Sequence, residues 1–197
     1  CHPEGRQTEM RKILTAAVAA LAISTLPAAA QGVKGGQDRQ VATRDGTCTE
    51  EQRTTIRRAF VDARQMTNES IAVLTLEPER IQPHLRRFFG ANPAGAIAKN
   101  IRAISRGLDE REGRVAYVRW GGGARETMGF CPTFFRAGRT GQDNQGGIVI
   151  HEMSHLALGT RDHAYQPRGA EALAKDNPSA AQMNADSYEY FAEFLPR

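Results

Sequence analysis

Apolar residues in the first half of the chain follow a helical period. After a polar stretch, Thr49 and Gln52 have the spacing of a capping box, in which each side chain bonds the backbone N–H of the other residue. The apolar residues that follow recur three or four positions apart: Ile56, Ala59, Phe60, Ala63 and Met66. Similar patterns cover residues 78–89 and 94–107, the second with isoleucines at 97, 101 and 104. These patterns predict three amphipathic helices.

The second half begins with a different pattern. Residues 115–120 are rich in β-branched and aromatic side chains and end at consecutive glycines, which predicts a strand. Residues 127–130 and the pair Phe134–Phe135 predict further strand or extended chain. A helix is expected over 147–158, and another is expected to start at Pro178 and to run nearly to the C-terminus. The expected fold is α+β, with a helical first half and a small sheet.

The N-terminal residues have the features of a secretory signal. Residues 10–30 combine basic residues after a Met, a short apolar run and a stretch of small residues, in the order that an export signal requires. Residues 1–9 precede that Met and are interpreted as a non-native upstream segment, and residues 31–47 are interpreted as a flexible lead-in. These boundaries predict a domain over 48–197 that is secreted or periplasmic, with cleavage near Ala30 and no membrane insertion afterwards.

Composition and charge narrow the class of protein. The 197 residues are 40% hydrophobic and 24% charged, which is typical of a globular chain and excludes collagen, coiled coils and mostly disordered proteins. The formal charge of +4 is scattered along the chain and does not indicate a nucleic-acid partner. Only Cys48 and Cys131 lie beyond the predicted signal, and export favours a disulfide between them, with two buried thiols as the alternative.

The segment His151-Glu152-Met153-Ser154-His155 carries the most specific chemical signal in the chain. Two histidines four residues apart share one face of a helix, so both imidazoles can reach one metal ion. Glu152 lies beside that site, where a carboxylate can accept a proton from the attacking water. The pattern is typical of zinc metallopeptidases, which also require a third protein ligand and an open coordination position.

Several residues are candidates for the third ligand. A Gly three positions and a ligand six positions after the second histidine would indicate a metzincin, but Leu158 and Arg161 stand there. Glu171 would suit a thermolysin-like arrangement, although no supporting pattern surrounds it. Asp162 offers a hard carboxylate soon after the predicted helix ends, and His163 is the alternative beside it.

The residues around this motif also resemble a known family. A Gly-Thr-x-Asp-x-x-Tyr segment, residues 159–165, follows the His-Glu-x-x-His motif as it does in the aspzincins, which comprise the deuterolysins and the peptidyl-Lys metalloendopeptidases. Residues 131–135, ahead of the histidines, and residues 184–189, near the C-terminus, are similar to other segments of that family. Gln166 departs from the family pattern, which has Gly after the tyrosine.

The resemblance implies a zincin-like fold that holds one Zn²⁺ per chain. It implies that His151, His155 and Asp162 are the zinc ligands. It also implies that Glu152 is the general base and that Tyr165 stabilises the transition state. The expected activity is that of a secreted zinc metalloendopeptidase, a monomer acting on protein or peptide substrates.

Two acidic residues near the C-terminus suggest a substrate preference. Asp186 and Glu189 are three residues apart, so their carboxylates share one face of a helix. In the lysine-specific relatives, an Asp and a Glu at these motif positions hold the substrate lysine, so the resemblance implies cleavage on the amino side of lysine. A solvated acidic face is the simpler alternative, and Asp186 is also a candidate for orienting a metal-bound histidine.

Other functions are compatible with the same motifs. An exported zinc-binding protein without turnover is one alternative, and a toxin-like peptidase that acts on a single partner protein is another. Digestion of casein with and without a chelator separates the first alternative from a general peptidase. The second alternative predicts no activity on generic substrates.

Overall fold

The computed structural model describes residues 48–111, 128, 130 and 132–196. Its helices are α1 (Glu50–Leu76), α2 (Pro78–Phe89), α3 (Ala94–Arg111), the short 3-10 helix η1 (Phe134–Arg136), α4 (Gln145–Leu158), α5 (Gln166–Asp176), α6 (Pro178–Gln182) and α7 (Ala185–Glu193). None of the helices in this described part has the length and apolar content that a membrane span needs.

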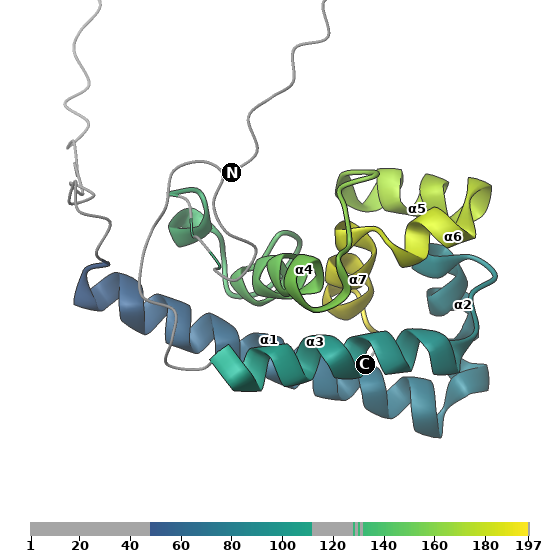
Figure 1. The fold of residues 1–197 in the computed structure, drawn as a ribbon, viewed down its shortest axis with the longest axis horizontal. Coiled ribbons are helices and arrows are strands. Elements are labelled where there is room, and N and C mark those ends of the chain that lie inside the picture. Colours follow the sequence, from purple (N-terminus) through teal and green to yellow (C-terminus); the bar gives the residue numbers. More distant parts are fainter. Residues whose placement is uncertain (1–47, 112–127, 129, 131, 197) are drawn as a thin grey trace, which may run out of the picture. The chain divides into compact units, whose positions relative to one another are not determined.

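The first three helices support the rest of the domain. α1 and α3 lie side by side and run in opposite directions, and α4 packs against both (Figure 1). The predicted capping box is present, because Thr49 Oγ1 accepts from the Gln52 N–H at 3.2 Å and Gln52 Oε1 accepts from the Thr49 N–H at 2.9 Å. The predicted helix 78–89 is confirmed with the same bounds, and the one predicted at 94–107 extends to Arg111.

A continuous apolar core joins these helices to α4 and α7. The isoleucines predicted to form a stripe on α3 are all buried. Thr67 and Ser70 are buried on α1, but each hydroxyl donates to a carbonyl of the same helix, at 3.0 and 2.8 Å, so neither is left unsatisfied. The core also contains Ile56, Phe60, Ile81, Leu85, Phe88, Leu108, Val149, Ile150, Met153 and Phe191.

The region predicted to form a sheet contains no strand among its described residues. Phe134–Phe135 were expected to be extended, but this prediction is wrong because they lie in η1, whose turns are closed by bonds to Thr133 O at 3.1 and 3.2 Å. Met128 and Phe130 are buried and belong to no helix or strand. The predicted strand at 115–120 lies outside the described residues. β-Structure in the described part is confined to one isolated bridge that joins Arg161 to Asn184.

The predicted C-terminal helix is two helices, which corrects the expectation from the sequence. α6 ends at Gln182 and α7 begins at Ala185, with Met183 and Asn184 between them. Asn184 is extended, with φ −102° and ψ 125°. The backbone groups on either side bond to a distant residue, because the Arg161 N–H donates to Met183 O at 2.8 Å and the Ala185 N–H donates to Arg161 O at 3.1 Å. These long-range bonds replace helical ones.

Helix α4 carries the two histidines of the motif. It starts two residues before the predicted position because Asn144 caps it, with Oδ1 accepting from the Gly147 N–H at 2.9 Å. It ends at Gly159, as predicted, with φ 70° in the left-handed region that glycine favours. The buried residues of its apolar face include Val149 and Met153, whereas Ala157, one turn after Met153, is exposed.

Candidate active site

The three predicted ligands lie together where α4 passes into the following loop. Asp162 Oδ1 is 3.2 Å from Nε2 of both His151 and His155, and the two Nε2 atoms are 3.2 Å apart. The side chains of His151, His155 and Asp162 are only 12, 21 and 9% exposed. Two imidazole nitrogens and one carboxylate oxygen that converge in this way match the three protein donors of a catalytic zinc site, in which a fourth position is left open.

The second nitrogen of each imidazole is bonded to the protein. His151 Nδ1 lies 2.9 Å from Asp186 Oδ1 and 3.1 Å from Glu189 Oε2, and His155 Nδ1 lies 2.8 Å from Thr160 O. These oxygens accept a proton held on Nδ1, which orients both rings and turns the Nε2 lone pairs toward the shared point. The residues present therefore fit a zinc ion.

The charges around His151 are strongly coupled. Burial opposes protonation of this imidazole, but its bonds to Asp162, Asp186 and Glu189 outweigh burial and raise its pKa to about 12. Burial also opposes ionisation of Asp162, but the two histidines hold the pKa of its carboxyl well below its usual range. The carboxyl groups of Asp162, Asp186 and Glu189 around these imidazoles favour positive charge at this point, which a divalent cation would also supply.

The predicted base and the predicted tyrosine both border the site. Glu152 follows His151 on α4 and is half-buried, and its carboxylate makes no hydrogen bond or ion pair to another described residue. Tyr165 precedes α5 and is 55% exposed. Burial, although slight, and the neighbouring Asp162 carboxylate raise the pKa of the Tyr165 hydroxyl. The hydroxyl is therefore protonated at neutral pH and able to donate a hydrogen bond.

The remaining candidates occupy distinct positions. Asp186 and Glu189 are both buried behind His151, in the arrangement expected of carboxylates that orient a ligand, and their contact with substrate stays a prediction. His163 is exposed, and the described ligand clusters contain Asp162 in its place. Glu171 lies on α5 and pairs with an arginine of α2 at 2.8 Å.

The loop that carries Asp162 and Tyr165 is held by the predicted site residue Asp186 and by Asn184, which the sequence did not single out as functional. Asn184 Oδ1 accepts from two N–H groups of this loop, and Asp186 Oδ2 accepts from the Gln166 N–H at 2.7 Å. Gln166 has φ 66°, which explains why a glycine suits this position in the family pattern. The glycine of the family pattern was the sequence signal for this conformation, because glycine at a loop position indicates a left-handed residue.

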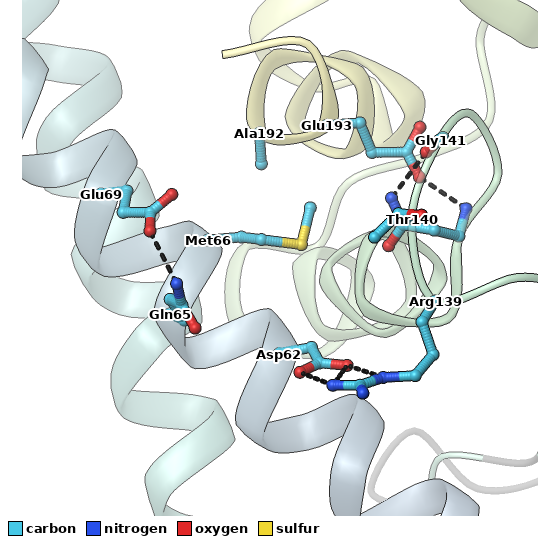
Figure 2. A pocket seen from close by; sticks show the side chains of 10 residues that line it. Asp62, Gln65, Met66, Glu69, Arg139, Thr140, Gly141, Ala192 and Glu193 are labelled. Atoms are coloured by element: carbon cyan, nitrogen blue, oxygen red, sulfur yellow. Dashed lines mark hydrogen bonds and ion pairs between the residues drawn. The ribbon is translucent and has the colours of Figure 1, made fainter. Parts of the chain in front are cut away.

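A cavity of about 280 Å³ lies at the N-terminal end of α4, lined by residues of α1 and α7 and by the segment 139–144 (Figure 2). Glu193 forms one wall, and its two oxygens accept from the N–H groups of Asp143 and Asn144 at 3.0 and 2.8 Å. Burial and the charge of Glu189 raise the pKa of Glu193 to about 8. None of the predicted ligands lines this cavity.

The predicted disulfide involves one described cysteine. Cys48 is buried at the start of α1, with 5% of its surface exposed. Cys131 lies outside the described residues. The pairing of these two cysteines therefore stays a prediction.

Comparisons with known proteins relate this geometry to a family. The aspzincin M35 family model, described as lysine-specific metallo-endopeptidase, matches residues 79–193. A peptidyl-Lys metalloendopeptidase of Armillaria mellea is 49% identical over 72 residues, which cover 36% of this chain and 20% of that protein. An extracellular protease of Aeromonas hydrophila is 31% identical over 165 residues, which cover 77% of this chain and 47% of that protein. The chain thus spans less than half the length of these relatives.

A solved structure supports the same relationship. A zinc peptidase from Grifola frondosa is 27% identical, with a TM-score of 0.56, and the match covers 74% of this chain and 96% of that one. The zincin-like fold expected from the resemblance is therefore confirmed. Because the family model also spans more than half of the sequence, the chain belongs to the aspzincin M35 family of lysine-specific metallo-endopeptidases.

Proposed function

We propose that this domain is a zinc metalloendopeptidase whose zinc ligands are His151, His155 and Asp162. The convergence of their donor atoms, each 3.2 Å from the other two, carries the proposal. A bound zinc ion would polarise the scissile carbonyl and acidify the attacking water. Hydrogen bonds at both Nδ1 atoms support the assignment, because they leave each Nε2 available to a metal.

The neighbouring side chains have complementary roles in the proposed reaction. The half-buried Glu152 carboxylate accepts the proton of the attacking water and returns it to the leaving amine. The Tyr165 hydroxyl donates a hydrogen bond to the oxygen on which negative charge develops. The exposure of Tyr165 supports this role, because the hydroxyl must reach a substrate that enters from solvent.

We further propose that the enzyme cleaves on the amino side of lysine, with Asp186 and Glu189 accepting hydrogen bonds from the lysine ammonium. Each carboxylate oxygen can accept a second hydrogen bond beside the one it makes to His151. Relatives named peptidyl-Lys metalloendopeptidase support this preference. Export of the protein is proposed on the signal pattern of residues 10–30 and on the relative named extracellular protease.

Glu152→Gln tests the reaction. The variant should lose activity on a lysine-containing peptide by on the order of 10³-fold, because an amide cannot accept the proton, while the zinc content stays that of the wild type. Glu171→Gln is the matched control, since this residue pairs with α2 and should leave cleavage unchanged. Retained activity in Glu152→Gln would overturn the mechanism. Wild-type protein that binds zinc but cleaves no generic substrate would favour a zinc-binding protein or a narrow peptidase instead.

Sequencing of cleavage fragments tests the preference. Fragments of a denatured protein should begin with lysine, and Asp186→Asn and Glu189→Gln should each raise KM for lysine peptides. A broad mixture of first residues would remove both carboxylates from substrate recognition and leave them only the role of orienting His151.

A further inference from the structure

The break between α6 and α7 places a buried asparagine against the loop that carries Asp162. Asn184 is 0% exposed, and its Oδ1 accepts from two consecutive backbone N–H groups, those of His163 at 2.9 Å and Ala164 at 3.0 Å. These two groups directly follow Asp162 in the chain. We propose that Asn184 is a positioning residue that holds Asp162 at the metal, an inference that rests on the proposed zinc site.

The backbone before Asp162 is bonded to the same segment between α6 and α7. Arg161 donates its N–H to Met183 O at 2.8 Å and accepts from the Ala185 N–H at 3.1 Å. Four hydrogen bonds from residues 183–185 therefore bracket Asp162, two before it and two after it. The bracket fixes the backbone and leaves the Asp162 side chain directed at the two histidines.

The chemistry of the Asn184 amide is fixed by its neighbours. Two N–H donors require an oxygen at the Oδ1 position, because a nitrogen there would leave three donors facing one another. The amide nitrogen donates to Ser187 Oγ at 3.2 Å, which holds the other end of the group. An apolar residue at position 184 would leave both loop N–H groups without a partner, whereas an aspartate would still accept from both.

The same loop carries other residues of the proposed site, so its position affects metal binding as well as folding. Thr160 O bonds His155 Nδ1 at one end of the loop. Tyr165 stands at the other end, followed by Gln166, whose N–H donates to Asp186 Oδ2. Without Asn184, the middle of the loop loses both side-chain bonds, and Asp162 must be ordered again at each metal-binding event. Loss of such supporting partners costs about 10- to 100-fold in metal affinity.

Zinc affinity of the folded protein, measured by competition with a chromogenic chelator, tests the proposal. Asn184→Ala should bind zinc about 10- to 100-fold more weakly, and Asn184→Asp should stay within about threefold of wild type, because the acceptor is restored. Asn177→Ala is the matched control, since Asn177 Oδ1 also accepts a backbone N–H, that of Ala180 at 3.0 Å on α6, away from Asp162. An Asn184→Ala affinity equal to that of Asn177→Ala, or equal losses in Asn184→Ala and Asn184→Asp, would overturn the proposal.

Hydrogen exchange in the zinc-free wild-type protein decides the matter even where Asn184→Ala does not fold. The amides of His163 and Ala164 should exchange slowly, because both are bonded to Asn184 before any metal binds. Exchange at the rate of an unstructured peptide would overturn the proposal. Neither measurement depends on peptide cleavage, so a protein that holds this loop but lacks activity would contradict the proposed function alone.

Discussion

The two sides of helix α4 are held in different ways. Toward α1 and α3 the helix is packed through apolar side chains, among which Val149 and Met153 are fully buried. Toward α7 it meets carboxylates. Glu193 accepts two N–H groups at the beginning of α4, and Glu189, one turn earlier on α7, bonds His151 together with Asp186. One side is a hydrophobic interface, and the other adds buried carboxylates to the apolar core that α4 and α7 share.

The difference separates stability from function. Apolar contacts favour folding at any pH, because apolar side chains have no group that gains or loses a proton. Buried carboxylates oppose folding unless a cation or a strong donor offsets them, and burial raises the pKa of both Glu189 and Glu193. The acidic side therefore suits a domain that is completed by a divalent cation, whereas the apolar side holds α4 in place without one.

The largest expected effect is on the apolar side. Met153→Ala should lower the free energy of unfolding by about 2–5 kcal/mol, because Met153 is 0% exposed and its truncation leaves a cavity. The packing is close, since a Cβ on Gly107 would lie 2.7 Å from Met153 Sδ. Leu76→Ala is the control, because Leu76 is 77% exposed and its loss should cost less than about 0.5 kcal/mol. Urea unfolding of the zinc-free proteins measures both.

Zinc binding by the same variants sharpens the comparison. If the two sides are independent, folded Met153→Ala should keep the zinc affinity of the wild type within about threefold. Met153 packs toward Gly107 of α3 whereas His151 bonds Asp186 and Glu189 of α7, so the two side chains share no partner. A loss as large as that expected for Asn184→Ala would mean that the apolar side also positions the ligands.

A smaller effect, dependent on pH, is expected on the acidic side. Glu193 has a pKa raised by burial and by Glu189, from an ordinary value of 4.5 to about 8. Protonated Glu193 is favoured in the folded state, so its contribution is fully present below about pH 4.5 and is lost as the pH rises through 8. The free energy of unfolding should therefore fall between pH 5 and 9. Glu193→Gln, which cannot ionise, should flatten that decline, and an unchanged slope would contradict this account.

The sequence predicted the apolar side of the domain far better than the acidic one. The capping box of α1 and the isoleucine stripe of α3 follow from local spacing, so both were predicted from the sequence alone. The two histidines of α4 were predicted for the same reason, since four residues make one helical turn. Asp162 was one of several candidates by chemistry, and its position was implied by resemblance alone.

The parts that the sequence did not predict depend on contacts between distant segments. The apolar pattern after Pro178 runs through Asn184 without interruption, but backbone bonds to Arg161 break the helix there. The contact of Glu193 with the start of α4 spans about 50 residues of sequence and leaves no periodic signal. Neither feature has a local cause that spacing or propensity could indicate.

The smallest predicted effect concerns the end of the loop that faces the acidic side. Gln166 has φ 66°, a left-handed conformation that costs a residue with a side chain roughly 1 kcal/mol. Gln166→Gly removes this strain and keeps the backbone bond to Asp186, but it gives up the side-chain bond from Gln142 at 2.9 Å. The free energy of unfolding should therefore rise by about 0.5 kcal/mol, since glycine also gains entropy in the unfolded chain.

Gln142→Ala removes the same side-chain bond without changing the strain, so it should lower the free energy of unfolding by no more than about 0.5 kcal/mol. The difference between the two variants in free energy of unfolding therefore gives the cost of the left-handed backbone conformation at position 166. A Gln166→Gly protein less stable than Gln142→Ala would mean that the left-handed conformation is held at no cost. In that case a glycine at this position would serve some need other than backbone freedom, and the loop would owe its shape to its hydrogen bonds, among them those to Asn184 and Asp186.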